Sequence, residues 1–272
     1  MTPLTRAIGA VIDNVDLACA LNHDTVAKIR EAYLEHLVIF FRNQTLEPSE
    51  LVRFATYFGK IGYYPFVKGM DEFPEVIEVI KKEDETINFG GLWHTDTSYL
   101  ENPPLGSILY AKEVPAVGGD TLFANMYMAY AGLSSTLQAL IADLRGVNSA
   151  AKPDAAVTRT HRIDDNPKDA STIVTTAIHP IARTHPETGK IALYCSDAHT
   201  LEIEGMSADE SRPLLQYLYR MQQREEYACR WHWETGDVAF WDNRCAQHNA
   251  LNDYQGQRRV MQRVTLQGER PR

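Results

Sequence analysis

The chain has 272 residues, of which 44% are hydrophobic, 23% charged and 10% aromatic, a composition typical of a folded globular protein. Its formal net charge of −9 disfavours nucleic acid or an anionic membrane as the main partner. It contains no run of about 18 apolar residues, and the N-terminal residues lack the pattern of a signal peptide, so we expect a cytoplasmic protein. Its four scattered cysteines form no CxxC motif and are expected to be reduced, buried thiols.

Helix and strand patterns alternate between Ala7 and Ile80. Val26, Ile29 and Tyr33 recur at helical spacing after Asp24, which is a suitable cap. The run Leu37 to Phe41 is apolar and contains β-branched and aromatic residues, as buried strands do. The predicted elements are a strand and turn over Ala7 to Leu17, a helix over His23 to His36, a strand over Leu37 to Phe41, a helix over Glu47 to Phe58 that ends at Gly59, and a strand over Val76 to Ile80.

Short strands separated by turn residues dominate from about residue 90 onward. They are predicted over Ser107 to Ala111, Thr121 to Ala124, Ile191 to Tyr194, Arg230 to Trp233, Asp237 to Trp241 and Val260 to Leu266, with one helix over Ala208 to Glu226. This pattern favours a sandwich or barrel. No repeat or Gly/Ser linker divides residues 1–272, so we expect one domain. The polar segment 152–170 lacks periodicity and is predicted to be a long loop that serves as a lid.

The segment Trp-His94-Thr-Asp96-Thr-Ser-Tyr contains the most informative pair of side chains. On a strand, residues two apart point to the same face, so the His94 imidazole and the Asp96 carboxylate would project side by side. Such a pair can occupy two adjacent positions on a metal ion. A third ligand must come from elsewhere in the chain.

His248 is the strongest candidate for that third ligand. It follows the strand Asp237 to Trp241 and precedes a strand that contains arginines. Two histidines and one carboxylate on one side of a metal are typical of non-haem Fe(II) oxygenases, although zinc accepts the same ligands. The other histidines considered are His161, His179, His185, His199 and His232.

A threonine and two arginines accompany these residues. Thr121 directly follows the turn Gly118 to Asp120, and Arg259 and Arg263 follow His248 near the end of the chain. The two arginines share a face if they lie on a strand. Because a guanidinium binds a carboxylate through two hydrogen bonds, this face would suit a dicarboxylate beside the metal.

Taken together, these motifs resemble the TauD/TfdA family of Fe(II)- and 2-oxoglutarate-dependent dioxygenases. Three further stretches match the family in order: Pro-Ala-Val-Gly-Gly-Asp-Thr121-Leu-Phe-Ala-Asn, His179-Pro with Thr184-His-Pro-Glu-Thr-Gly-Lys190, and Trp-Asp-Asn-Arg244 followed by His248, Arg259 and Arg263. The resemblance covers nearly the whole chain. It implies a mainly β fold with flanking helices, the double-stranded β-helix or jelly roll of the cupin type.

The resemblance also implies roles for individual residues. His94, Asp96 and His248 would be the catalytic iron ligands, and Thr121 and Arg259 would bind the distal carboxylate of 2-oxoglutarate. The enzyme would use O2 to hydroxylate a C–H bond of a small substrate and release succinate and CO2. Relatives that halogenate lack the carboxylate ligand, so Asp96 favours hydroxylation.

The sequence departs from the taurine-cleaving relatives near the substrate. They have an Asn shortly before the HxD motif and a His in the loop after the second helix, and neither is present here, which makes taurine doubtful as the substrate. Tyr63, Tyr64 and His199 are candidate substrate contacts, and Arg263 keeps an acidic substrate plausible. The primary substrate, its stereochemistry and the oligomeric state, including a possible homo-oligomer, do not follow from the sequence.

Two alternatives remain at this point. The first is a catalytically silent jelly-roll protein that binds a metal and a small acid as a sensor. The second is a zinc hydrolase, although the chain has no HExxH motif to provide a general base.

Overall fold

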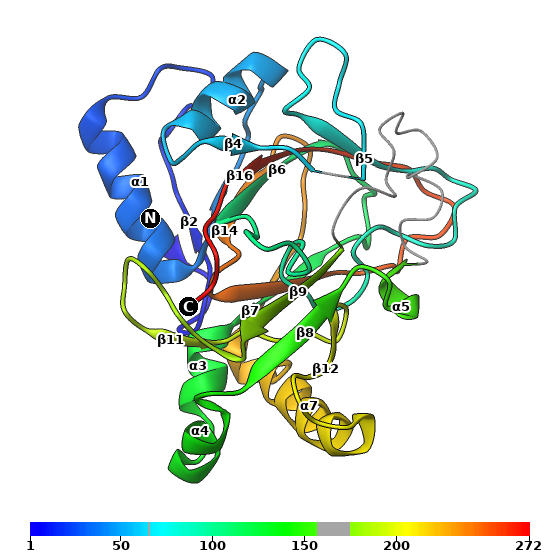
Figure 1. Ribbon diagram of the computed structural model, residues 1–272. Coiled ribbons are helices and arrows are strands. Elements are labelled where there is room, and N and C mark those ends of the chain that lie inside the picture. Colours follow the sequence, from blue (N-terminus) through cyan, green and yellow to red (C-terminus); the bar gives the residue numbers. More distant parts are fainter. Residues whose placement is uncertain (65, 157–174) are drawn as a thin grey trace.

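The computed structural model describes residues 1–64, 66–156 and 175–272 (Figure 1). The described part consists mainly of β-strands with a few helices at its edges. The predicted lid falls largely outside the described residues, as does His161. None of the described helices has the length and apolar composition needed to cross a membrane.

The strands are mostly short. They are β1 (Thr2–Pro3), β2 (Ala10–Val11), β3 (Val38–Phe41), β4 (Ile61–Gly62), β5 (Ile77–Lys81), β6 (Gly106–Glu113), β7 (Thr121–Asn125), β8 (Arg145–Ser149), β9 (Thr176–Pro180), β10 (Ala182–Thr184), β11 (Ile191–Leu193), β12 (Thr200–Ile203), β13 (Ala228–Trp231), β14 (Val238–Asp242), β15 (Ala246–Ala250) and β16 (Arg259–Leu266). The helices are α1 (His23–His36), α2 (Pro48–Thr56), α3 (Met126–Ala131), α4 (Ser135–Ile141), α5 (Pro153–Ala156), α7 (Ala208–Gln222) and the 3-10 turn Glu225–Tyr227.

The largest described sheet has the order β1-β2-β3-β14-β6-β16-β4, with β5 also paired to β16. Two smaller sheets have the orders β13-β7-β15 and β12-β8-β9, and β10 and β11 form a hairpin. All strand pairs among the described residues are antiparallel except β2 with β3. In Figure 1, α1 and α2 cover the outer side of the large sheet, and α3, α4 and α7 lie at the opposite end of the molecule.

Alternation along β3 shows why the large sheet is buried on both faces. Val38 and Phe40 point into a core shared with β7 and β13, whereas Ile39 and Phe41 point into a second core under α1 and α2. Phe40 stacks on Trp231 of β13 with ring centroids 3.9 Å apart. A strand that is apolar at every position is expected where both faces are covered. The space between the large sheet and the β13-β7-β15 sheet is therefore a packed sandwich interior.

Helix ends explain most of the differences between the predicted and observed boundaries. The side chain of Asn22, not Asp24, caps α1 by accepting a hydrogen bond from the Thr25 amide. Glu47 lies outside α2 as its N-cap, because it forms a capping box with Glu50. The predicted 208–226 helix ends at Gln222, and a separate 3-10 turn follows it.

The elements that were not predicted from the sequence include helices α3 and α4 and strands β4, β8, β9, β10, β12 and β15. Both helices are short, with six and seven residues, so they show little periodicity. Their caps are clear in the structure, since the side chains of Asn125 and Ser134 accept hydrogen bonds from the first turn of each helix. All four cysteines are free, as predicted, but Cys19 is exposed rather than buried.

Candidate metal centre and adjoining cavities

His94 and His248 are held opposite each other by the backbone. The His94 amide donates to the His248 carbonyl at 3.0 Å, and the His248 amide donates to the His94 carbonyl at 2.8 Å. This reciprocal pair is an isolated antiparallel bridge between β15 and the HxD segment. Residues opposite each other in such a bridge have adjacent side chains, and the two imidazole centroids are 4.2 Å apart.

Asp96 completes a cluster of three buried ligand atoms. Its Oδ1 lies 3.8 Å from His94 Nε2 and 3.9 Å from His248 Nε2. The three ligand atoms lie within 4.8 Å of one another. The predicted strand geometry is wrong here, because His94 makes only the isolated bridge and a turn begins at Asp96. Thr97 has a φ of 44°, a left-handed conformation that is unusual for a β-branched residue and redirects the chain directly after the carboxylate.

The protonation states of this cluster are those that metal ions require. Burial would raise the pKa of Asp96, but the charge of Arg263, the two imidazoles and the Ser107 hydroxyl hold that pKa well below its ordinary value of 3.8. Burial holds the pKa of His248 well below 6.5. Asp96 is therefore ionised and His248 neutral at neutral pH, and metal ligands must be in these forms.

The donor set fits a divalent transition metal. His94 Nδ1 donates to the Leu92 carbonyl at 2.6 Å, which fixes the tautomer that leaves a lone pair on Nε2. Two imidazoles and one carboxylate, converging from one side, form the 2-His-1-carboxylate set that suits non-haem iron.

One cavity next to this cluster contains two buried arginines. Thr121, Arg259 and Arg263 line it together with His94 and His248. Arg259 and Arg263 are only 6% and 5% exposed. Nε and Nη2 of each have no hydrogen-bond partner among the described residues. A buried cation with free donors is costly unless an anion binds it, so this cavity is suited to a carboxylate ligand.

The turn before β7 positions Thr121. Gly118 and Gly119 have φ values of 85° and 70°, which favour glycine, and a Cβ on Gly118 would lie 2.9 Å from the Asp253 carbonyl oxygen. The Thr121 hydroxyl accepts a hydrogen bond from Trp233 Nε1 at 2.9 Å. Its own hydrogen therefore remains available to a ligand in the cavity.

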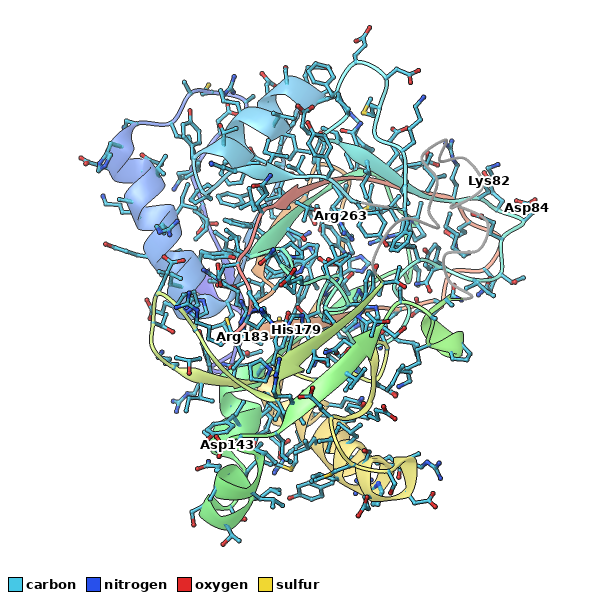
Figure 2. All side chains as sticks on the ribbon, in the orientation of Figure 1. Lys82, Asp84, Asp143, His179, Arg183 and Arg263 are labelled. Carbon is cyan, nitrogen blue, oxygen red and sulfur yellow. The ribbon has the colours of Figure 1, made fainter. Side chains whose placement is uncertain are left out.

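A second cavity meets the first at Phe89, Gly90 and His94, and polar and apolar groups both line it. It is lined by His94 and Asp96 and by the side chains Tyr64, Phe89, Leu92, Tyr99, Ala198 and His199. The imidazole centroids of His199 and His94 are 5.7 Å apart. Arg263 lies with its guanidinium carbon 5.0 Å from the Tyr64 ring centroid. In Figure 2, Arg263 is near the middle of the molecule. Tyr63 is 63% exposed and lines neither of these two cavities.

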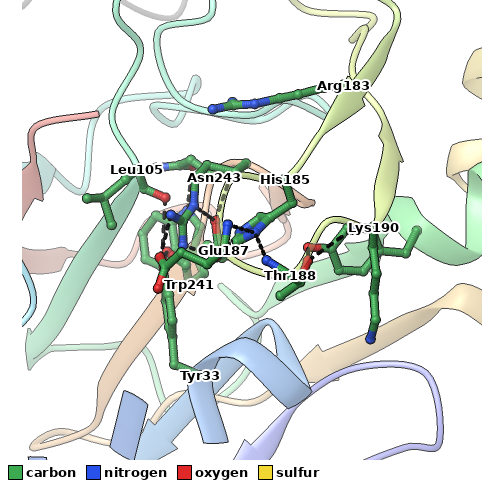
Figure 3. Close-up of polar contacts among 12 residues, drawn as sticks. Tyr33, Leu105, Arg183, His185, Glu187, Thr188, Lys190, Trp241 and Asn243 are labelled. Carbon is green, nitrogen blue, oxygen red and sulfur yellow. Dashed lines mark hydrogen bonds and ion pairs between the residues drawn. The ribbon is translucent and has the colours of Figure 1, made fainter. Parts of the chain in front are cut away.

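The remaining described histidines that the sequence offered lie outside the cluster. His179 Nε2 donates to the Leu100 carbonyl at 2.8 Å. His232 is half exposed and pairs with Asp120. His185 is fully buried and donates to Asp242 at 3.1 Å. Figure 3 shows His185 beside Glu187 and Thr188, whose backbone amides donate to His185 Nδ1.

Two residues of the site were not singled out from the sequence. Ser107 Oγ donates to Asp96 Oδ2 at 2.7 Å, and Asn243 Nδ2 donates to Ser107 Oγ at 3.1 Å. Asn243 stands in the Trp-Asp-Asn-Arg motif, so its position was visible in the sequence although its contact was not. Ser107 gave no signal, because a serine in a short predicted strand has no distinguishing pattern.

Comparisons with known proteins find matches over nearly the whole chain. The profile of the taurine catabolism dioxygenase TauD, TfdA family matches residues 1–265. An alpha-ketoglutarate-dependent sulfate ester dioxygenase of Pseudomonas putida is 37% identical, over 99% of this chain and 89% of the relative. An alkylsulfatase of Acinetobacter baylyi is 35% identical, over 98% and 84%. The crystal structure of a taurine dioxygenase from Burkholderia xenovorans superimposes with a TM-score of 0.84 at 36% identity, covering 99% of this chain and 91% of that one.

Proposed function

The chain belongs to the TauD/TfdA family of Fe(II)- and 2-oxoglutarate-dependent dioxygenases with a cupin-type jelly roll, and on this premise we propose that it oxidises a small organosulfur anion, most specifically a sulfate ester. The alternative of a silent sensor finds no support, because the named relatives are enzymes over nearly the whole chain. A cytoplasmic location and a homo-oligomeric state stay predictions.

We infer that His94, Asp96 and His248 hold the iron. The convergence of their ligand atoms within 4.8 Å is the single observation that supports this most strongly. Their burial supports it too, since all three lie at the junction of two cavities rather than at the surface. Bound iron, 2-oxoglutarate (alpha-ketoglutarate) and O2 would together supply the oxidant for a C–H bond, with succinate and CO2 as the other products.

Thr121 and Arg259 would bind the distal carboxylate of 2-oxoglutarate. Arg259 offers Nε and Nη2 donors that no described residue accepts from, and Thr121 offers a hydroxyl on the same cavity wall. A buried guanidinium and a hydroxyl can together satisfy both oxygens of one carboxylate. Arg263 lies closer to the metal ligands, with Nη1 3.2 Å from Asp96 Oδ1. It would bind an anionic group next to the metal, from either the cosubstrate or the substrate.

The second cavity would hold the substrate carbon chain. Phe89, Leu92 and Tyr99 provide apolar or aromatic surface there, and Asp96 is the only carboxylate among the described lining residues. Since Asp96 would hold the metal, the described lining offers no further carboxylate for an ammonium group. This argues against taurine, which carries one, and favours an anion with a hydrocarbon tail. Tyr64 and His199 remain the candidate substrate contacts. Tyr63 lines neither cavity and would contact a substrate only at the protein surface.

The residues that line this cavity would orient the substrate and keep water from the reacting carbon. If that carbon carries a sulfate oxygen, its hydroxylation gives an unstable product that breaks into an aldehyde and inorganic sulfate. An alkyl sulfate, 2-oxoglutarate and O2 would thus yield aldehyde, sulfate, succinate and CO2 with one proton released.

A substrate comparison tests this function. Purified enzyme with Fe(II), ascorbate and 2-oxoglutarate is offered hexyl sulfate, hexanesulfonate, phenoxyacetate and taurine, and succinate and inorganic anions are quantified. We expect equimolar succinate and sulfate from hexyl sulfate and the least succinate from taurine. Turnover of taurine above hexyl sulfate would contradict the proposed substrate class.

Asp96→Ala tests the metal assignment in the same assay. We expect it to abolish succinate formation, because the only anionic ligand of the centre is lost. Asp84→Ala, which removes an exposed carboxylate, is the matched control and should retain full turnover. Unchanged turnover in Asp96→Ala would remove Asp96 from the metal centre.

A further inference from the structure

A short chain of hydrogen bonds ends on the carboxylate of the metal centre. Ser107 of β6 donates from Oγ to Asp96 Oδ2 at 2.7 Å. Asn243, in the turn between β14 and β15, donates from Nδ2 to Ser107 Oγ at 3.1 Å. Trp241 Nε1 in turn donates to Asn243 Oδ1 at 3.0 Å. All of these side chains are buried, and Ser107 and Asn243 are 0% and 1% exposed.

The chemistry of a hydroxyl group sets the donor-to-acceptor direction of these hydrogen bonds. A serine has one hydrogen to donate, and the Asn243 amide already donates to its oxygen. The Ser107 hydrogen is therefore directed to Asp96, whose Oδ2 accepts it. With Oδ2 engaged, Oδ1 is the oxygen that faces the imidazole nitrogens of His94 and His248, and Arg263 Nη1 lies 3.2 Å from it. The two carboxylate oxygens thus have different environments before any metal binds.

Asn243 also holds the backbone on which Asp96 lies. Its Oδ1 accepts from the Asp96 amide at 3.3 Å, and its carbonyl accepts from the Thr95 hydroxyl at 2.6 Å. The same turn leads directly into β15, which carries His248. One residue therefore links the HxD segment to the strand of the third ligand.

We propose that Asn243 is a positioning residue that acts through Ser107 to keep Asp96 Oδ1 available to the metal. The inference rests on the proposed function, since it concerns the same metal centre. Asn243 and Ser107 line neither cavity, so they act only by fixing the orientation of Asp96. Removing hydrogen-bond partners of metal ligands typically weakens metal binding about 10- to 100-fold.

Calorimetric titration of the metal-stripped protein with Mn(II) tests the proposal without relying on turnover. We expect Ser107→Ala and Asn243→Ala each to raise the Mn(II) Kd by about 10- to 100-fold. The double variant should raise it by clearly less than the product of the two, because both changes interrupt one chain. Ser107→Cys, of similar volume but with a weaker donor, should weaken Mn(II) binding in the same direction. It serves as a second variant if either alanine variant fails to fold.

Ser211→Ala is the matched control. Ser211 is also a buried serine, but it lies on α7 rather than at the metal centre, and its Oγ accepts one hydrogen bond from the Ile203 amide at 3.0 Å. This variant should lose some thermal stability and keep a wild-type Mn(II) Kd. A Kd within about twofold of wild type in folded Ser107→Ala or Ser107→Cys, or a double variant equal to the product of the single effects, would overturn the positioning role. Failure of the wild-type protein to bind Mn(II) would instead refute the metal centre itself.

Discussion

Two buried clusters of similar composition differ in how their polar atoms are used. The first is the candidate metal centre of His94, Asp96 and His248, and the second consists of His185, Asp242 and Cys245. The ligand atoms of each lie within 4.8 Å of one another. By residue type and spacing alone, either could hold a metal ion.

The second cluster is saturated by hydrogen bonds. Asp242 Oδ1 accepts from the amide and Nε of Arg244, and Oδ2 accepts from Arg244 Nη2 at 2.7 Å and from His185 Nε2 at 3.1 Å. His185 Nδ1 accepts from two backbone amides, so its lone pair is occupied. Burial raises the pKa of the Cys245 thiol well above 9, which keeps it from becoming the thiolate that metals bind.

The metal centre has the opposite character. The Nε2 atoms of its two imidazoles face Asp96 Oδ1, and the neighbouring Arg259 and Arg263 carry buried donors without acceptors among the described residues. Two cavities open onto these atoms. The comparison teaches that uncompensated charge and access to a cavity distinguish a binding site from a structural network of the same residue types. Such a network contributes to folding, whereas the metal centre remains incomplete without ligands.

The largest expected effect comes from breaking the saturated network. Arg244→Ala would leave Asp242 and Glu187 without their main cation, and removing one partner of a buried ion pair typically costs about 3–5 kcal/mol. Urea denaturation should therefore show a loss of this size in the free energy of unfolding. Arg145→Ala removes an arginine from an exposed pair with Glu204 and should cost less than about 1 kcal/mol. Equal losses in the two variants would show that the Arg244 network is not a structural element.

Arg259→Ala should have little effect on stability and a large effect on ligand binding. Because no described carboxylate pairs with Arg259, the ligand-free protein should lose no more than about 1 kcal/mol of stability and could gain some. Binding of 2-oxoglutarate should weaken at least about tenfold, since a buried charged hydrogen-bond partner is typically worth about 2–5 kcal/mol. Calorimetry with 2-oxoglutarate measures the affinity and urea denaturation the stability.

Arg258→Ala is the control for that substitution. Arg258 is the adjacent residue, but its side chain is 41% exposed and pairs with Glu113. This variant should keep wild-type affinity for 2-oxoglutarate. If Arg259→Ala binds the cosubstrate as tightly as Arg258→Ala does, the distal carboxylate is held elsewhere.

The smallest expected effect is the change in stability caused by Glu187→Gln, and it should depend on pH. Burial opposes ionisation of Glu187, but hydrogen bonds and charge from Arg244 and Arg30 lower its pKa below 4.5. A carboxyl with a depressed pKa in the folded state stabilises the protein above its unfolded pKa, and this stabilisation disappears as the pH falls through the folded pKa. Glu187→Gln should therefore cost about 1–2 kcal/mol at pH 7, and its difference from wild type should shrink below about pH 4.5. Glu202→Gln, at an exposed position on β12, should show no such pH dependence. A constant difference for Glu187→Gln across this range would contradict the ionic role.

Local patterns made much of the fold predictable. The helix His23–His36 has the predicted bounds, and the strands over β3, β5, β6, β7, β14 and β16 lie within one or two residues of their predicted ends. Where the prediction failed, tertiary contacts decide the structure. His94 and His248 are distant in the sequence and meet through one backbone bridge, so neither the bridge nor β15 has a local signal.

The convergence of the candidate metal ligands was predictable and their surroundings were not. His94, Asp96 and His248 belong to motifs that short spacing and family resemblance reveal, and the structure brings them together. The burial of His185 depends on Asp242 and Arg244, which belong to a distant part of the sequence. The contact of Ser107 with Asp96 depends on the register between β6 and β14. Such partners follow from the packing of sheets, which a single sequence does not display.

Metal stoichiometry tests the central contrast most directly. The metal-stripped wild-type protein, His248→Ala and Cys245→Ala are each titrated with Mn(II) in a calorimeter. The account predicts one tightly bound ion per chain in the wild type and in Cys245→Ala, and none in His248→Ala. Tight binding that persists in His248→Ala, or that disappears in folded Cys245→Ala, would contradict it.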